Sequence, residues 1–227
     1  MPVFNAGVSA AKILSAALHI PCYTFSHQEG HIESVRFFSP LRDVDEMLSF
    51  HFSGGTTEAL LVKNGRISII GGSRDIAFGQ VLDRVGVKLG MEFPCGEEMD
   101  KIASRLTGSE PFVSENILPP IKCNDGFINL SGIETCCQRA AEKTDSEELI
   151  SMLFMRIGEA ICAMTEQLSH KYGISRVLYA GGVSASRFIR RYIQSRLPQT
   201  EICFGEPALS TDNAVGTAIL GGKKYGA

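Results

Sequence analysis

The chain has 227 residues, of which 44% are hydrophobic and 21% charged, and its formal net charge is −3. This composition is that of a globular protein with one substantial core or two small lobes. The mild negative charge argues against a protein that coats nucleic acid, although it is compatible with a local basic patch. The chain contains no uninterrupted run of 18 apolar residues and opens on no charged-then-apolar leader. We therefore expect no membrane span and no export through a visible signal.

Cysteine usage favours a reducing compartment. The seven cysteines are an odd number, form no Cys-x-x-Cys pair, and include the adjacent Cys136 and Cys137, which make a poor disulfide framework. Reduced thiols in a cytoplasmic protein explain this pattern best.

The N-terminal part predicts a helix, a short strand and a second helix. Residues 8–19 are alanine-rich and repeat apolar side chains at helical spacing. Residues 21–25 predict the strand, and Ser26 then occupies an N-cap position before HQEGHIESV. Residues 37–45 predict a connector, because Pro40 interrupts regular structure.

Residues 48–70 predict three strands joined by two turns. Asn64-Gly65 between β-branched runs is the strongest short hairpin signal in a sequence. The turn at residues 53–56, Ser-Gly-Gly-Thr, combines two glycines with hydroxyl groups, so its backbone N–H groups could wrap an anion. An ordinary hairpin turn explains the same residues, and the turn alone does not decide between the two.

Helices and strands alternate after this hairpin. We expect strands at residues 126–130, 176–179 and 201–204, and a surface excursion at residues 107–125. We expect helices at residues 78–89, 97–106, 133–142, 147–172 and 211–221, and a basic helix that Ser184 caps and that ends at Arg196. Three hairpin-linked strands followed by helix, strand, helix, strand and helix form the plan of one lobe of the actin, sugar-kinase and chaperone ATPase fold, a mixed α/β sheet with helices on its faces.

Two histidines and an aspartate are candidate metal ligands. His27 and His31 would share one face of a helix that begins after Ser26, which suits zinc or iron; two partly exposed histidines at a helix start are the alternative. Asp212 stands at a predicted helix start, where taken alone it is more readily a cap than a ligand. A zinc protease requires His-Glu-x-x-His, whereas Gln28 follows the first histidine here, so protease chemistry is disfavoured.

Other charged residues are ambiguous from sequence alone. Asp83 could lie on the polar side of its helix or face a ligand. One short predicted helix carries four arginines, which are usually a solvated face but also form the one plausible footprint for a polyanion: Arg187, Arg190, Arg191 and Arg196.

Seven motifs in order resemble one family. They are residues 26–31 (SHQEGH), 53–55 (SGG), 82–84 (LDR), 93–96 (FPCG), 131–133 (SGI), 180–183 (AGGV) and 211–214 (TDNA). Together they resemble the TsaD family, also called Gcp or O-sialoglycoprotein endopeptidase, over nearly the whole chain. That family makes the threonylcarbamoyl modification of adenosine in tRNAs that read codons beginning with A.

The resemblance implies an actin-like ATPase fold and a set of site residues. A divalent metal, iron or zinc, would be held by His27, His31 and Asp212. The threonylcarbamoyl-adenylate or ATP would be held by Phe52, Ser53, Gly54, Gly55, Thr56, Asp83, Gly96, Gly181, Gly182 and Ser186. The implied partners are tRNA and either an actin-like paralogue or a second copy of the chain. No catalytic general base can be named from the sequence.

Departures from the family pattern leave alternatives open. Thr56 stands where the family has a histidine, Ser186 where it has an asparagine, and Glu134 where it has a lysine. The family's opening phosphate loop has no counterpart, so we expect residues 1–48 to be the remnant of an N-terminal lobe and residues 49–227 a C-terminal lobe. The hypotheses are a metal-dependent threonylcarbamoyl transferase, a non-catalytic nucleotide-binding or scaffolding paralogue, and, third, a metalloprotease.

Overall fold

A mixed seven-stranded sheet forms the centre of the molecule. The computed structural model describes residues 2–106, 117–209 and 214–226. The strand order is β4-β5-β3-β2-β1-β6-β7. The strands are β1 (Glu46–Phe52), β2 (Thr57–Lys63), β3 (Arg66–Ser73), β4 (Cys123–Asn124), β5 (Phe127–Ile128), β6 (Arg176–Ala180) and β7 (Glu201–Phe204).

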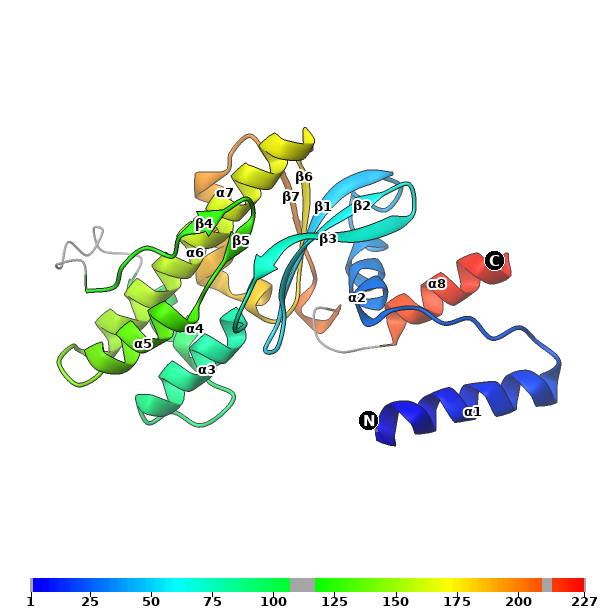
Figure 1. The fold of residues 1–227 in the computed structure, drawn as a ribbon, viewed down its shortest axis with the longest axis horizontal. Coiled ribbons are helices and arrows are strands. Elements are labelled where there is room, and N and C mark those ends of the chain that lie inside the picture. Colours follow the sequence, from blue (N-terminus) through cyan, green and yellow to red (C-terminus); the bar gives the residue numbers. More distant parts are fainter. Residues whose placement is uncertain (1, 107–116, 210–213, 227) are drawn as a thin grey trace.

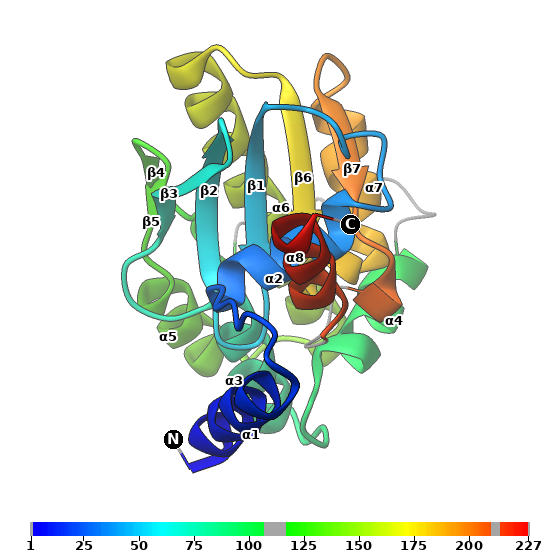
Figure 2. The same ribbon diagram turned by 90° about the vertical axis from the view of Figure 1, so that its right-hand side faces the viewer.

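Helices cover both faces of this sheet. Figures 1 and 2 show α2 and α8 on one face, and α3 to α7 gathered on the other. The helices are α1 (Pro2–Leu18), α2 (His27–Arg36), α3 (Phe78–Lys88), α4 (Gly96–Leu106), α5 (Ser131–Ala140), α6 (Ser146–Tyr172), α7 (Arg187–Arg196) and α8 (Val215–Tyr225), with short 3₁₀ turns at Val183–Ala185 and Pro207–Leu209. Within the described ranges, no helix combines the length and the apolar character that crossing a bilayer requires.

The predicted three-stranded hairpin is confirmed. β1, β2 and β3 pair antiparallel in chain order. Asn64 and Gly65 have φ values of 50° and 71°, as a hairpin turn with two left-handed residues requires. β6 then pairs parallel with β1, with His51 opposite Ala180, so these two strands end side by side. The carboxyl ends of neighbouring parallel strands are where open α/β sheets bind ligands.

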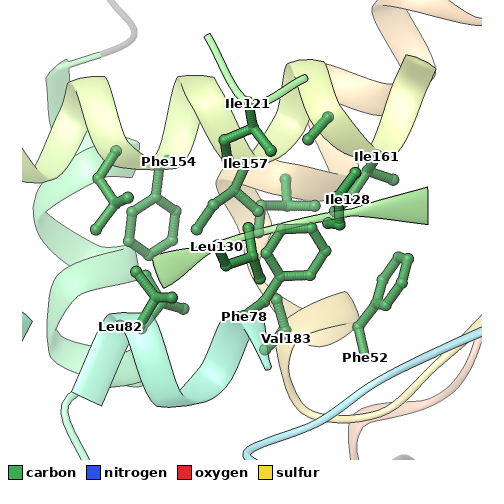
Figure 3. Packing of buried hydrophobic residues seen from close by; sticks show 14 of the residues in the cluster. Phe52, Phe78, Leu82, Ile121, Ile128, Leu130, Phe154, Ile157, Ile161 and Val183 are labelled. Carbon is green, nitrogen blue, oxygen red and sulfur yellow. The ribbon is translucent and has the colours of Figure 1, made fainter. Parts of the chain in front are cut away.

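Strand β1 divides the interior into two clusters because alternate side chains point to opposite faces. Leu48, Phe50 and Phe52 belong to the larger cluster, which α3, α4, α5, α6 and α7 complete. Figure 3 shows Phe154 and Ile157 of α6 on one side of that cluster and Leu82 and Phe78 of α3 on the other. Met47 faces the smaller cluster beneath α2. The polar residues Ser49 and His51 share the side of Met47, so the face beneath α2 is less apolar than the other.

Local capping follows the sequence at one helix and departs from it at another. The predicted N-cap Ser26 is confirmed: it forms a capping box with Glu29, whose backbone N lies 3.2 Å from Ser26 Oγ. The prediction that Ser184 caps the basic helix is wrong. Ser184 lies in the 3₁₀ turn before α7 and donates to Ala180 O at 2.9 Å, and the N-cap is Ser186.

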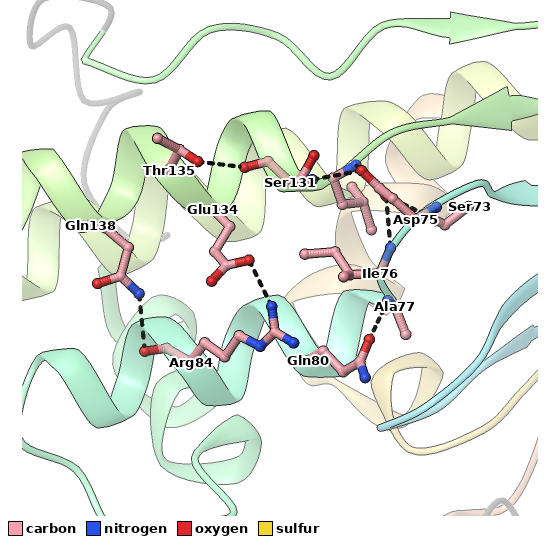
Figure 4. Close-up of polar contacts among 11 residues, drawn as sticks. Ser73, Asp75, Ile76, Ala77, Gln80, Arg84, Ser131, Glu134, Thr135 and Gln138 are labelled. Atoms are coloured by element: carbon pink, nitrogen blue, oxygen red, sulfur yellow. Dashed lines mark hydrogen bonds and ion pairs between the residues drawn. The ribbon is translucent and has the colours of Figure 1, made fainter.

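Asp75 joins the start of α3 to the start of α5. Its carboxylate accepts hydrogen bonds from the backbone N–H groups of Ile76, Leu130 and Ser131 at 2.7 to 3.0 Å, and from Ser73 Oγ (Figure 4). Burial alone would raise the pKa of Asp75, but these hydrogen bonds lower it well below its usual range. Arg84 and Glu134, 3.0 Å apart, add a second link between the same two helices.

Two predicted strands differ from the structure. Residues 21–25 form no strand, because nothing pairs with them and their side chains are exposed or half-buried. The strand predicted at residues 126–130 shortens to Phe127–Ile128, since only these residues pair with β3 and β4. The predicted excursion at residues 107–125 lies partly outside the described residues, and its last part supplies β4.

Helix α1 lies apart from the sheet in both views (Figures 1 and 2). The helix predicted at residues 8–19 is confirmed as part of it. From Ala6 to Leu18 every side chain is exposed except the half-buried Ser15, and Ile13 is 68% exposed. The apolar face of α1 is therefore not part of either core cluster.

Candidate functional site

The predicted histidine pair is present on α2. The capping box begins the helix at His27, so the side chains of His27 and His31 project one turn apart from the same face. Their Nε2 atoms lie 3.0 Å apart and their rings meet edge to face. His27 is exposed and His31 is buried, so the pair opens to solvent from one side.

The pair fits a transition metal. Two nitrogens that each bind one ion at about 2.0–2.1 Å, with an angle of roughly 90–110° at the ion, lie roughly 2.9–3.4 Å apart. The observed 3.0 Å falls in this range, and it is equally the length of a hydrogen bond between the two rings. Imidazole nitrogen suits zinc and iron better than magnesium or calcium, which prefer oxygen.

Asp212, the predicted third ligand, lies outside the described residues, but the segments on both sides of it contact α2. Before it, Leu209 O lies 3.2 Å from Ser34 Oγ. After it, α8 packs so tightly that a Cβ on Gly216 would lie 1.9 Å from Gly30 O. The last helix therefore abuts the histidine helix, as the three-ligand hypothesis requires. Lys223 of α8 adds an ion pair to the buried Glu33 of α2.

His51 lies beside the histidine pair, and sequence reasoning did not single it out. It occupies the last-but-one position of β1, faces α2 and is 1% exposed. Its ring centroid lies 4.4 Å from that of His31 and 6.4 Å from that of His27. Three of the five histidines of the chain are thus in one cluster. The available signal was a histidine near the end of a largely apolar predicted strand, just before a Ser-Gly-Gly turn.

The turn at residues 53–56 follows His51 within two residues, so the histidine cluster and the turn are neighbours. Ser53 N donates to Thr56 O at 2.8 Å, and Ser53 Oγ accepts from Thr56 N. A Cβ on Gly79 of α3 would lie 2.5 Å from Gly54 Cα, so the helix start packs directly on the turn. A Cβ on Gly54 or Gly55 would meet nothing within 4 Å, so their outer side is open.

The second glycine pair lies against the first. Gly181 has φ +92°, and a Cβ there would lie 2.3 Å from Phe52 O, so only glycine fits. Gly182 is exposed, and a Cβ on it would meet no atom within 4 Å. The Phe52 side chain is fully buried in the larger cluster, so only its backbone reaches this edge.

Asp83 holds the loop before α4. Its Oδ1 accepts a hydrogen bond from Cys95 N at 2.9 Å, directly before Gly96. Burial, together with the charges of Asp83 and Glu98, raises the pKa of the Cys95 thiol. Cys95 is therefore a neutral packing residue rather than a nucleophile.

Ser186 is engaged within the protein. Its hydroxyl lies 2.5 Å from Asp100 Oδ1 and accepts from Ile189 N. The same Asp100 carboxylate accepts from the backbone N–H groups of Arg187 and Phe188. The start of α7 is thus neutralised by a carboxylate from α4, and these N–H groups are not open to a phosphate in this arrangement.

The predicted site residues that the structure describes do not form a complete metal centre. Among residues 2–106, 117–209 and 214–226, no three His, Cys, Asp or Glu side chains could hold a metal ion. A depression of about 720 Å³ lies at the opposite end of the strands, lined by Asp43, Asp45, Glu46, Arg176 and Glu201 among others. It is remote from the glycine turns and the histidines.

The fold and this site define a member of the actin-like ATPase fold, with glycine turns at the ends of adjacent parallel strands. The chain resembles the solved structure of HypF from T. kodakarensis with TM-score 0.72 and 13% identity, over 96% of this chain and 39% of that one. It also resembles component A of the (R)-2-hydroxyglutaryl-CoA dehydratase of Acidaminococcus fermentans, with TM-score 0.58 and 16% identity, over 94% and 74% of the two chains. These likenesses show the fold.

The chain belongs to the TsaD family, whose sequence model, described as tRNA N6-adenosine threonylcarbamoyltransferase, matches residues 4–219. Curated relatives with that name include one from Geobacillus kaustophilus, 29% identical over 96% of this chain and 66% of the relative. Another, from Lacticaseibacillus casei, is 27% identical over 91% of this chain and 62% of the relative. The chain thus spans slightly less than two thirds of the length of these relatives.

Proposed function

We propose that this chain transfers a threonylcarbamoyl group from its adenylate to an adenosine of tRNA. The observation that carries the proposal is that three features lie at the carboxyl ends of β1 and β6: the histidine cluster, the turn at residues 53–56 and the Gly181-Gly182 turn. Family membership supplies the reaction class. An activated carbonyl, a leaving phosphate and an incoming amine need such adjacent binding elements.

We assign His27, His31 and Asp212 as the ligands of one divalent ion, iron or zinc. The 3.0 Å between the two Nε2 atoms supports the histidines, and the contacts of Leu209 and Gly216 with α2 support a ligand from the segment between them. When bound, the ion would supply Lewis-acid stabilisation of charge on a substrate oxygen. His51 backs the His31 ring and so restrains its orientation.

The two glycine turns would hold the adenylate. The open sides of Gly54, Gly55 and Gly182 allow a phosphate to approach their backbone N–H groups. Ser53 and Thr56 add hydroxyl donors, while Asp83 fixes the loop that presents Gly96.

In the reaction, the N6 amine of adenosine attacks the carbamoyl carbon. A carbon–nitrogen bond forms, the bond from that carbon to the phosphate oxygen breaks, and AMP leaves with the bonding electron pair. The amine releases one proton to water, because no side chain near these turns is assigned as a general base. The role of the protein is therefore positioning and charge stabilisation.

A non-catalytic nucleotide-binding paralogue is the second candidate, and the contacts of Ser186 favour it. The Ser186 hydroxyl already donates to Asp100 and accepts from the backbone of α7, so it is poorly placed to contact a ligand. A metalloprotease has less support, because the carboxylate of Glu29 accepts from Ser26 N at 2.6 Å instead of facing the histidine pair.

The direct test is transfer of labelled threonylcarbamoyl from its adenylate to unmodified tRNA by the full chain, alone and with candidate actin-like partners. The His31→Ala variant should lose both metal and transfer, whereas His170→Ala, an exposed histidine on α6, should keep both. Bound adenylate without transfer under every condition would leave the paralogue hypothesis standing. A tRNA substrate and seven free cysteine thiols also agree with a cytoplasmic protein.

A further inference from the structure

Helix α7 concentrates positive charge in a chain of net charge −3. Its ten residues, RFIRRYIQSR, include four arginines and no acidic residue. Arg190 serves the fold: its Nε donates to Ser184 O at 2.8 Å, a second nitrogen donates to Gly205 O, and the guanidinium lies over the Phe204 ring. This anchor orients the helix and leaves the other three arginines outside.

Arg187, Arg191 and Arg196 are exposed. In the described part of the chain, no carboxylate lies within ion-pair distance of any of them. Two carboxylates of α4 act on Arg187: Asp100 accepts a hydrogen bond from its backbone N–H at 2.9 Å, and Glu97, which interacts with it electrostatically, is itself paired with Lys101 at 2.7 Å. The helix therefore presents exposed guanidinium groups that form no ion pair with the described residues, although the Asp100 carboxylate caps the start of the helix.

The geometry also connects this face to the proposed site. Arg187 follows the N-cap Ser186 and is separated from the Gly181-Gly182 turn by the short 3₁₀ turn Val183–Ala185, and Arg191 lies one helical turn further along the same face of α7. A ten-residue helix is about 15 Å long. The arginine face thus begins within one short turn of the glycine pair of the proposed site.

We propose that the arginine face of α7, defined as Arg187 and Arg191, binds backbone phosphates of the tRNA substrate. This inference rests on the proposed function, because that function requires an RNA whose adenosine reaches the Gly181-Gly182 turn. Arginine forks pair with phosphate oxygens in a bidentate manner, and such contacts orient an RNA without reading its sequence. An acidic protein is the rival occupant, but continuity with the substrate turn favours RNA.

The test compares two double variants with equal loss of charge. Arg187→Gln with Arg191→Gln removes the proposed contacts and keeps good helix formers. Arg66→Gln with Lys224→Gln removes two exposed charges on β3 and α8 that also have no ion pair in the described residues. Affinity of the full chain for an unmodified tRNA transcript is measured across a range of salt concentrations, together with the unfolding midpoint of each variant.

We expect the α7 variant to reduce the slope of log affinity against log salt by about 2, because each lost phosphate contact removes about 1. The control variant should keep the slope of the wild type. Equal slopes for both variants would overturn the proposal. Displacement of the RNA by polyglutamate at the same charge concentration would overturn it in favour of an acidic protein.

The transfer assay separates this inference from the proposed function. A wild type without transfer whose RNA binding depends on Arg187 and Arg191 would refute the reaction and retain the surface. A wild type with transfer whose α7 variant binds tRNA with an unchanged slope would retain the reaction and refute the surface.

Discussion

Substituting Gly216 by alanine tests whether the contact between α8 and α2 builds the proposed metal site. The new Cβ would lie 1.9 Å from Gly30 O and 2.7 Å from Ser34 N. Both are backbone atoms of α2, so neither can rotate away. The start of α8 must move by roughly 1.5 Å to restore an ordinary contact of about 3.5 Å.

This movement displaces the chain next to Asp212 relative to the histidine pair. A change of this kind in a supporting shell typically lowers metal affinity by about 10–100-fold. Overpacking should also lower the free energy of unfolding by about 1–3 kcal/mol. Alanine is the better helix former by about 1 kcal/mol, which offsets part of that loss.

The assay is titration calorimetry of zinc into the metal-free full chain at constant pH, with circular dichroism to confirm folding. Gly221→Ala is the matched control, because it lies on the same helix and its Cβ would meet nothing within 4 Å. It should bind metal as the wild type does. Wild-type affinity in a folded Gly216→Ala variant would show that the segment before α8 does not contribute a ligand to the histidine pair.

Three further predictions concern the turns, acid stability and α1. Gly55→Val and Gly182→Val should each abolish binding of an adenylate analogue in calorimetry. The fold should persist in both variants, because a Cβ at either position meets no protein atom within 4 Å. Unchanged affinity in both variants would show that the two glycine turns do not bind the ligand. The folded state depresses the pKa of Asp75, so ionised Asp75 stabilises the fold. This stabilisation is fully present above the ordinary Asp pKa of about 3.9 and is lost as the pH falls toward the lower pKa of the folded state. Wild type should therefore lose stability toward acid more steeply than Asp75→Asn in denaturant titrations at pH 7 to 3, and parallel curves would contradict this. We propose that residues 1–48 form an interface with a second copy or an actin-like paralogue through α1. Burial of its apolar face at about 25 cal/mol per Å² could contribute several kcal/mol to association. Light scattering across a dilution series, alone and with such a partner, should show association, and a monomer at all concentrations that binds no hydrophobic dye would contradict the proposal.

The sequence by itself determined the features that depend on neighbours along the chain. The spacing of His27 and His31 places both rings on one helix face wherever that helix lies. Ser26 and Glu29 cap each other within one turn, and Asn64-Gly65 closes a hairpin through its own φ preferences. These interactions span at most four residues, so local propensity suffices to predict them.

Tertiary structure alone decided which distant segments meet. The order of the sheet brings β6 beside β1, and this pairing places Gly181 on Phe52. His51 reaches His31 only because α2 folds back over the face of β1, twenty residues away in sequence.

The N-cap of α7 has the same origin. Ser184 and Ser186 are both serines close to the start of the predicted helix, so residue type alone does not say which one is the N-cap. Asp100 from α4 accepts hydrogen bonds from Ser186 and from the backbone N–H of Arg187, and these contacts select Ser186. Similarly, residues 21–25 have strand-forming side chains but no neighbouring strand to pair with. A strand or a cap is completed by hydrogen bonds from another segment, and periodicity within one segment cannot show whether that partner arrives.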